Sequence, residues 1–356
     1  MDDRATALPR PTLAGVAARA GVSVSTASLV FSGAGPVADA TRERVLAAAA
    51  ELDYAGPDPT ARSLRRGRSG VVAVITEDRL AEAFRDPMNL ALLDGIGEGL
   101  GDERMSLLVV PMAGADGDLI SAPMDAAILL GCGVDIASIV ESLRRRRIPI
   151  VGIETAPLPS VINVDLDNRS ASRRGAEHLH ELGHRRVAVV TLPLDPGRLR
   201  GPVEPERLSA SQAYGMVERL AGVREVFPDA PALSASASSI TEGLTAGRVL
   251  LAPEAGPRPT AIVAQSDLLA IGVLRAAEEA GVAVPGELSV LGFDGIRADG
   301  ATAHVLTTLV QPAVRKGRLA AEAVLAALAG DDPPREQLRS ELRIGTTTGP
   351  AAARRS

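Results

Sequence analysis

Residues 12–28 read TLAGVAARAGVSVSTAS, and this stretch decides how the first part of the chain folds. Its apolar residues recur at helical spacing on both sides of a break, as Leu13, Val16, Ala17 and Ala20 and then Ala27 and Val30. Gly21 stands where the first helix ends, and Ser23 stands where an N-cap opens the second. Two short helices joined by a glycine-containing turn of about three or four residues are typical of a helix-turn-helix motif.

A third helix is expected after this motif, beginning at Asp39 or Thr41. Its apolar residues recur at Val45, Ala49 and Leu52. Residues 10–68 carry eight arginines against five acidic residues, although the net charge of the whole chain is −6. A small basic head on a larger acidic body is typical of a DNA-binding module joined to another domain, but so small an excess also fits a chance fluctuation.

The composition excludes several classes of protein. With 356 residues, 46% of them apolar and 23% charged, the chain is expected to be globular with two or three domains. Its single cysteine, Cys132, excludes an internal disulfide, and an aromatic content of 2% predicts an aliphatic core. The chain has no uninterrupted apolar run of about 18 residues, and its first residues do not resemble a signal peptide, so we expect a cytoplasmic protein.

Beyond residue 70, short apolar runs alternate with longer amphipathic stretches. Strands are predicted at Val71–Ile75, Met105–Val110, Ala126–Leu130, Ile150–Ile153, Val187–Thr191, Ala261–Ala264 and Ser289–Phe293. Helices are predicted at Asn89–Leu100, Ile136–Arg146, Ser170–Leu182, Ser266–Ala280 and Val314–Leu328. Apolar strands that alternate with helices imply parallel sheets covered on both faces. The number of strands favours two doubly wound sheets, so the predicted fold class is α/β with a small all-helical head.

Enzyme and cofactor sites are only weakly indicated. Gly131 and Gly133 follow a predicted strand, but Ile136 stands where the dinucleotide fingerprint needs its third glycine. The only lysine is Lys316, and no Gly-Lys-Ser/Thr phosphate loop is present. The four histidines show no convincing metal-ligand spacing. We therefore predict no cofactor, no metal and no catalytic residue.

Segments of the head and of the body carry a common pattern. In the head they are residues 12–28, 41–45 and 61–64, and in the body they are Ser266-Asp267, residues 290–294 and residues 306–312. Together they resemble the LacI family of transcriptional regulators, and the resemblance extends from residue 11 to about residue 348. It implies a homodimer or a tetramer, with helix-turn-helix heads, hinge helices and a two-lobed, Rossmann-like effector domain of the periplasmic-binding-protein type I.

The resemblance also implies domain boundaries. They are residues 10–57 for the DNA-binding domain, 58–70 for the hinge helix and linker, and 71–348 for the effector-binding and dimerisation domain. Within this last domain the N-lobe comprises about 71–165 plus 311–330, and the C-lobe about 166–300 plus 331–348.

The second helix of the head is expected to enter the major groove of operator DNA with its first turn. The residues predicted to face the groove are Ser23, Val24, Ser25, Ser28 and Leu29, and those predicted to position the phosphates are Thr12, Thr26 and Tyr54. The resemblance adds Ala61, Arg62 and Leu64 of the hinge. It assigns Leu64 as the wedge that enters the minor groove, and the neighbouring arginines are then expected to neutralise phosphates, namely Arg62, Arg65, Arg66 and Arg68.

Two positions of the head depart from the usual family pattern. Leu29 stands where the family usually has arginine, and like Val24 it is limited to apolar contacts such as the thymine methyl group. Altered base preference, specificity carried by the hinge and by DNA shape, and a weakened head all stay open. Gly56 lengthens the spacing from Tyr54 to Leu64 by one residue relative to the family.

The effector is expected in a cleft at the carboxyl ends of the strands. The aromatic residues beside predicted cleft loops are Phe84, Tyr214 and Phe293. They either stack on a sugar-like ligand or pack in the core. The polar candidates are Ser266, Asp267, Asp294, Gln311 and Arg207, of which the last is the nearest match to the family's pocket arginine.

The sequence thus predicts a transcriptional regulator, expected to be a repressor, whose affinity for operator DNA is controlled by a small ligand. Such a ligand acts only through its different affinities for two lobe arrangements, so whether it weakens or strengthens DNA binding stays open. The alternative is a small-molecule-binding protein with a vestigial DNA-binding head, and an enzyme ranks third.

Overall fold

The computed structural model describes residues 11–33, 35–56, 68–76, 79–101, 103, 105–112, 122–131, 136–297 and 300–352. It comprises two compact units, Met1–Gly70 and Val71–Ser356. The hinge predicted at residues 58–70 falls mostly outside the described residues, and so do its contact residues Ala61, Arg62 and Leu64. The part of it that is described, residues 68–70, forms no helix.

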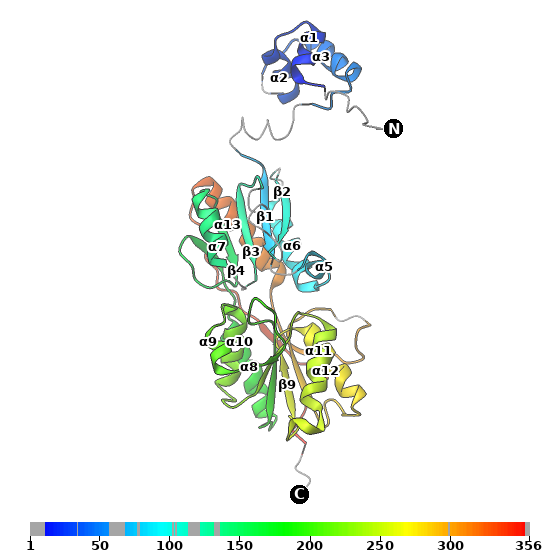
Figure 1. Ribbon diagram of the computed structural model, residues 1–356, viewed down its shortest axis with the longest axis vertical. Helices are drawn as coiled ribbons and strands as arrows, with labels where there is room; N and C mark the ends of the chain where they lie inside the picture. Colours follow the sequence, from blue (N-terminus) through cyan, green and yellow to red (C-terminus); the bar gives the residue numbers. More distant parts are fainter. Residues whose placement is uncertain are drawn as a thin grey trace, which may run out of the picture. The chain divides into compact units, whose positions relative to one another are not determined.

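The described residues of the first unit form three helices, α1 (Leu13–Ala20), α2 (Val24–Ser32) and α3 (Asp39–Glu51) (Figure 1). Thr12 and Ser23 cap α1 and α2, because their hydroxyl oxygens accept hydrogen bonds of 3.1 Å from the backbone N–H groups of Gly15 and Thr26. Gly21 ends α1 at a φ of 67°, and α2 follows at an angle of 107° to α1. This angle is typical of the predicted helix-turn-helix motif.

A small aliphatic core holds these three helices together. Its buried residues are Val16, Ala17, Ala20, Ala27, Val30, Val45, Ala48 and Ala49. The segment after α3 is fixed by an aromatic pair, since the rings of Phe31 and Tyr54 meet edge to face with centroids 5.5 Å apart. No single helix among the described residues is long and apolar enough to cross a membrane, and α1 and α2 meet that test only jointly, as a bent pair.

The second unit begins with a five-stranded parallel sheet in the order β2-β1-β3-β4-β5. Its strands are β1 (Val71–Thr76), β2 (Ser106–Pro111), β3 (Ala126–Leu130), β4 (Ile150–Ile153) and β5 (Val161–Val164). Helices α6 (Pro87–Leu100) and α13 (Ala313–Ala329) share a core with one face of the sheet, and α7 (Ile136–Arg145) packs on the other. The short helix α5 (Leu80–Ala83) follows β1. These elements are called the N-lobe.

A seven-stranded sheet, in the order β12-β11-β10-β9-β6-β8-β7, forms the C-lobe. Its strands are β6 (Val187–Thr191), β7 (Gly201–Pro202), β8 (Ala232–Ser234), β9 (Ala261–Ala264), β10 (Ser289–Asp294), β11 (Thr307–Val310) and β12 (Glu341–Arg343). Only the edge strands β7 and β12 pair antiparallel. One face is covered by α8 (Asn168–Glu181) and α10 (Tyr214–Arg224), and the other by α11 (Ile240–Leu251) and α12 (Asp267–Glu279). The predicted α/β class is confirmed.

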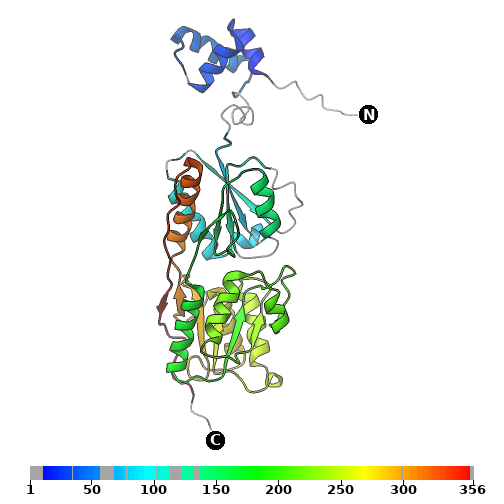
Figure 2. The same ribbon diagram turned by 90° about the vertical axis from the view of Figure 1, so that its left-hand side faces the viewer.

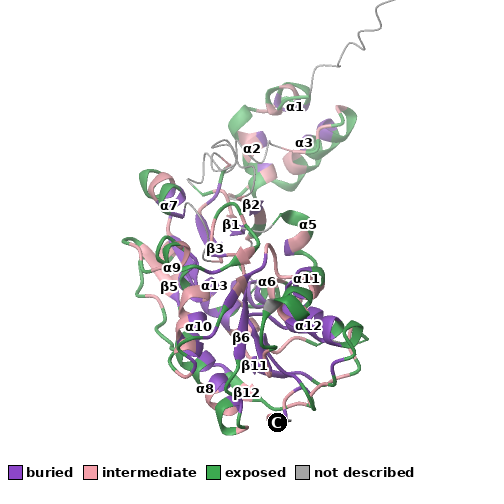
Figure 3. Ribbon diagram, turned by 60° about the horizontal axis from the view of Figure 1, so that its bottom comes forward, coloured by how far each residue is buried: buried purple, intermediate pink, exposed green. Residues whose placement is uncertain are grey.

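The chain passes between the two lobes three times. It enters the C-lobe between β5 and α8, returns between β11 and α13, and crosses again between α13 and β12 (Figure 2). Helix α13 therefore belongs to the N-lobe although it lies near the end of the chain. The central strands of both sheets are buried along their length (Figure 3).

Helices α6 and α13 approach each other more closely than ordinary side chains allow. A Cβ atom on Gly95 would lie 2.0 Å from the carbonyl oxygen of Val314, and one on Gly317 would lie 2.1 Å from that of Leu92. Only glycine fits at these two positions. This contact holds the part of α13 that carries Lys316 against α6, where the Lys316 side chain is buried.

Candidate functional site

The first candidate site is the outward face of α2 in the head. Val24 is 46% exposed and Leu29 is 39% exposed, and Ser25 is exposed beside them. Ala27 and Val30, on the opposite side of the helix, are buried. The predicted base-contacting residues thus share one accessible helix face, and Ser28 is half-buried at its margin.

Hydroxyl groups gather at the N-terminus of α2. The Ser23 hydroxyl lies 2.8 Å from the hydroxyls of both Ser25 and Thr26. The amino end of a helix favours a phosphate, because its N–H groups and dipole point toward the anion. Thr12 is exposed at the start of α1, whereas Tyr54 is half-buried against Phe31.

The Leu29 side chain also lies close to another part of the head. A Cβ atom on Gly35 would lie 3.4 Å from Cδ2 of Leu29, so this side chain leans over the loop that follows α2. The position that the family usually gives to arginine therefore presents an apolar side chain that is partly exposed.

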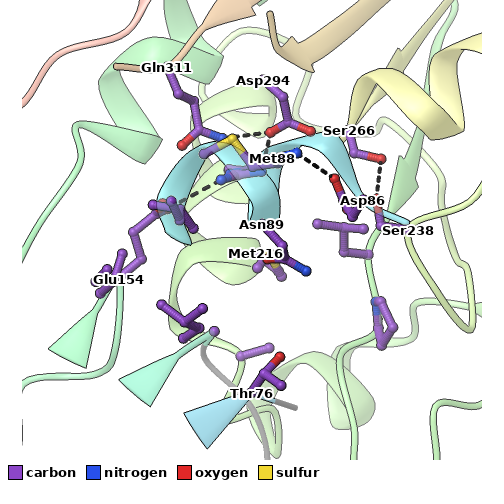
Figure 4. A pocket seen from close by; sticks show the side chains of 18 of the residues that line it. Thr76, Asp86, Met88, Asn89, Glu154, Met216, Ser238, Ser266, Asp294 and Gln311 are labelled. Carbon is purple, nitrogen blue, oxygen red and sulfur yellow. Dashed lines mark hydrogen bonds and ion pairs between the residues drawn. The ribbon is translucent and has the colours of Figure 1, made fainter. Parts of the chain in front are cut away.

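The second candidate site is a cavity of about 140 Å³ between the two lobes. Its lining comes largely from the carboxyl ends of strands, as with Thr76, Glu154 and Asp294, and from the first turn of α6 (Figure 4). The ends of parallel strands are where α/β sheets bind ligands. Ser266, Asp294 and Gln311, three of the predicted effector contacts, line this cavity.

None of the described residues that line this cavity is aromatic. Phe84 is 48% exposed and Tyr214 is 37% exposed, and neither is among the lining residues. Phe293 is buried in the core, where the guanidinium carbon of Arg219 lies 3.8 Å from its ring centroid. For Phe293 the structure thus favours core packing over stacking on a ligand.

Asp267 and Arg207, the two other predicted contacts, act on loops next to the cavity. The Asp267 carboxylate accepts hydrogen bonds from the N–H groups of Gly295 (2.8 Å) and Ile296 (2.9 Å), and burial raises its pKa to about 7. Arg207 donates to the Asp195 carboxylate and to the carbonyl oxygen of Leu199. It thereby holds the loop that carries Arg198.

Arg198 is the arginine of this loop that lines the cavity. It also pairs across the lobes with Glu82 of α5, at 3.6 Å. The sequence pointed to Arg207 instead, as the nearest candidate for the family's pocket arginine, although residues 208–214 depart from the usual family pattern by several residues. The choice between these two arginines depends on the folding of the loop, which the sequence pattern does not encode.

A closed chain of polar contacts forms one wall of the cavity, and we call it the polar ring. Its members are Glu154, Lys316, Gln311, Asp294 and Arg219. The Lys316 ammonium donates to Oε1 of Glu154 and to Oε1 of Gln311, and Nε2 of Gln311 donates to Oδ1 of Asp294 at 2.6 Å. Arg219 closes the ring, at 3.2 Å from Oε2 of Glu154 and 3.9 Å from Oδ1 of Asp294.

The ring controls the ionisation of its two acids. Burial by itself would raise the pKa of Glu154, but the nearby charges of Lys316 and Arg219 outweigh it and lower this pKa to about 2. For Asp294 burial prevails, and it raises the pKa well above the ordinary value although Arg219 opposes the shift. Sequence reasoning found Asp294 and Gln311 but missed Glu154, Arg219 and Lys316. The only available signal was that Lys316 is the single lysine.

Unusual backbone conformations mark the same cavity. Six residues other than glycine have a positive φ in the described part of the chain. Three of them line the cavity, namely Glu154 (54°), Arg198 (48°) and Asp294 (118°). Each such conformation costs about 1–3 kcal/mol and is typical of functional sites. Across the described residues, no group of three or more His, Cys, Asp or Glu is placed to hold a metal ion.

The chain is similar to known proteins along nearly its whole length. The model of bacterial regulatory proteins of the lacI family matches residues 12–56, and that of the periplasmic binding protein-like domain matches residues 176–348. The HTH-type transcriptional regulator Rv3575c of Mycobacterium tuberculosis is 34% identical over 360 residues, which are 96% of this chain and 98% of that relative.

Solved structures agree with this similarity. A complex of the transcriptional regulator CelR with cellobiose superposes with a TM-score of 0.66 at 26% identity, covering 95% of this chain and 100% of that one. The lac repressor dimer bound to operator and the anti-inducer ONPF superposes with a TM-score of 0.75 at 23% identity, covering 96% and 100%. This second likeness concerns the fold alone.

Proposed function

The chain belongs to the LacI family of bacterial regulatory proteins, and we propose that its effector is an uncharged, sugar-like molecule held in the cavity between the lobes. Membership makes it a DNA-binding transcriptional regulator controlled by a ligand. The alternative of a vestigial head is not favoured, since the head keeps its helix caps and its core.

The charge balance of the cavity carries this proposal. Acidic and basic side chains line it in equal number, as Asp86, Glu154 and Asp294 and as Arg198, Arg219 and Lys316. A lining of mixed sign offers neither an anion nor a cation a uniform complement, and an uncompensated buried charge is costly. Hydroxyl groups donate and accept, so they match a wall that offers both carboxylates and cations.

The volume adds a limit on ligand size. A cavity of about 140 Å³ resembles the engineered cavity of about 150 Å³ that admits benzene. In this lobe arrangement it therefore favours a ligand of one ring over a disaccharide. CelR, whose solved complex holds cellobiose, supports a sugar-like class for a related site.

On the DNA side, we propose that α2 lies in the major groove. Val24, Ser25, Ser28 and Leu29 then face base edges, and the apolar pair suits thymine methyl groups. Thr12, Thr26 and Tyr54 position the backbone phosphates, and Ser23 lies at the start of the groove-facing helix. For the hinge, Ala61, Arg62 and Leu64 keep the roles that the family resemblance implies.

We propose that the protein works in the cytoplasm as a homodimeric repressor. Two heads related by a two-fold axis bind the two halves of a palindromic operator. The segment 58–70 joins each head to its N-lobe, so a change of lobe arrangement alters how the heads engage DNA. The effector shifts this equilibrium by its differential affinity for the two arrangements.

A thermal-shift screen tests the proposed effector class. The panel contains neutral monosaccharides and cyclic polyols, cellobiose, nucleosides, glucuronate and glucose 6-phosphate. A ligand at about 100 times its Kd stabilises the fold by roughly 2.7 kcal/mol. We expect the shift from a neutral one-ring compound, which then changes affinity for an operator selected from random DNA. A shift from the anionic compounds alone contradicts the proposal, and so does a ligand without effect on DNA binding.

Two serine variants provide the matched control. Ser266 and Ser239 each cap a helix of the C-lobe, accepting a hydrogen bond of 3.2 Å from Leu269 and from Glu242. Of these two serines, only Ser266 is among the residues that line the cavity. Ser266→Ala should weaken ligand binding beyond what Ser239→Ala does, at a similar loss of stability. Equal ligand affinity in both variants places the ligand elsewhere.

A further inference from the structure

The polar ring joins the two lobes. Glu154 follows β4 and Lys316 lies on α13, so both belong to the N-lobe. Arg219 on α10 and Asp294 at the end of β10 belong to the C-lobe, and Gln311 lies in the segment between β11 and α13. The ring therefore links the two lobes at two places, which are the contact between Glu154 and Arg219 and the hydrogen bond from Gln311 to Asp294.

Lys316 organises this ring. Its side chain is 0% exposed, and its ammonium group donates to Glu154 and to Gln311. Because Oε1 of Gln311 is occupied by the ammonium, the amide nitrogen of Gln311 faces Asp294. Lys316 thus sets the orientation of an amide that reaches the C-lobe acid, although it does not touch that acid itself.

Arg219 is held as firmly on its own side. Its Nε donates to Oδ1 of Asn168 and its Nη1 to the carbonyl oxygen of Gln265, both at 2.8 Å. The Asn168 amide in turn donates to Oε2 of Glu154 at 2.6 Å. The Glu154 carboxylate is therefore shared between a cation of each lobe, and it connects them directly.

The ring contains two acids and two bases. Removing one charged member leaves a buried charge without compensation, whereas removing a neighbouring pair of opposite charges does not. Two ring members, Glu154 and Asp294, also have positive φ values, so their backbone conformations depend on contacts that hold them in place.

We propose that Lys316 is a positioning residue that closes the polar ring and thereby holds the two lobes in the arrangement seen here before any effector binds. An effector in the cavity then acts on lobes that the ring has already aligned. This step rests on the proposed function only for its regulatory meaning, because every contact of the ring is made between side chains of this chain.

Distances between the lobes test this inference in the full chain without effector. Spin labels are placed at Ala137→Cys on α7 and Val249→Cys on α11, both exposed, in a Cys132→Ser background. Labelled chains are diluted with an excess of unlabelled chains, so that pulsed electron resonance gives the distance distribution between the lobes of one chain. We expect one narrow distance for the parent, and for Lys316→Met a broader distribution with a second population.

The double variant Lys316→Met/Glu154→Gln keeps the test valid if the single variant does not fold, because it removes both charges of one ion pair. It also opens the ring, so we expect the same broad distribution. The matched control is Arg173→Met, which removes an exposed pair with Glu177 inside the C-lobe and should leave the distance unchanged.

The parent distance retained in the folded double variant overturns the proposal, since the lobes are then aligned by packing alone. The result does not depend on the nature of the effector. If the lobes loosen but no compound of the panel changes operator binding, the inference stands and the proposed function fails.

Discussion

Helix α2 presents Val24, Ser25 and Leu29 to solvent within two turns, whereas the cavity gathers its charges from distant segments and buries them. Glu154 and Lys316 are in contact although they are 162 residues apart in the sequence. The difference follows from the two partners. A DNA groove admits a rigid exposed helix, but a small ligand has to be surrounded to lose its water. A site for a large partner is therefore built locally, and a site for a small one depends on the whole fold.

This contrast also determines what was predictable from the sequence. The cap Ser23, the turn glycine Gly21 and the predicted start at Asp39 or Thr41 are local signals, and the structure confirms the three helices that they indicate. The long apolar strands were also predicted, because burial on both faces makes them continuous hydrophobic runs. Strands β5, β7, β8, β11 and β12 were missed, because runs of two to four residues carry little periodicity of their own.

Only some of the residues that line the cavity could be predicted from the sequence. Ser266 and Asp294 follow apolar strands, and strand ends indicate a ligand site in any doubly wound sheet. Arg219 and Lys316 lie within helices, where an isolated charge normally indicates a solvent-exposed face. Nothing in their local sequence shows that both are buried. The boundaries predicted for the lobes, and the roles of the individual site residues, stay predictions.

The largest expected effect is a loss of stability around the cavity, without a change in the head. Lys316→Met leaves Glu154 buried without its closest cation, and removing one partner of a buried pair costs about 3–5 kcal/mol. Denaturant unfolding of the full chain, followed by circular dichroism, measures this loss. The exposed pair Arg248–Glu279 is the control, and Arg248→Met should lower the stability far less than Lys316→Met does, because exposed ion pairs contribute little. Equal losses in both variants contradict a special role for the ring.

Acid should weaken the cavity in a predictable pH range. The pKa of Glu154 is lowered to about 2 in the folded chain from an ordinary value of 4.5, so its contribution is complete above pH 4.5 and is lost as the pH falls toward 2. The difference corresponds to roughly 3 kcal/mol. Unfolding measured across this range in parent and Glu154→Gln should show a steeper loss for the parent. Parallel pH profiles count against the ion pairs of Glu154.

A third variant tests whether α13 depends on close helix contact. Gly317→Ala puts a methyl group where only 2.1 Å separates the new Cβ from the carbonyl oxygen of Leu92. Overpacking of this kind costs about 1–3 kcal/mol. The same substitution at Gly97 of α6, where nothing lies within 4 Å, should be neutral or slightly stabilising. Thermal unfolding of the two variants distinguishes them, and similar melting temperatures contradict the prediction.

The smallest expected effect concerns the stability of the head. Ser23→Ala removes the N-cap of α2 and should cost about 1 kcal/mol of head stability. Amide hydrogen exchange, read separately for residues 11–56 and for residues 71–352, reports where the change falls. Faster exchange in the head alone is expected, because the head has its own core. Ser32→Ala, at the other end of α2, serves as the control.

The burial of the only lysine has a practical consequence for labelling chemistry. Apart from the α-amino group, an amine-directed reagent finds a single target on this chain, and that target is 0% exposed when the ring is closed. Acylation at residue 316 can proceed only during openings that admit the reagent, so its rate measures how often the ring opens. The acylation rate of Lys316, measured by mass spectrometry, therefore reports the opening of the ring in the unmodified chain.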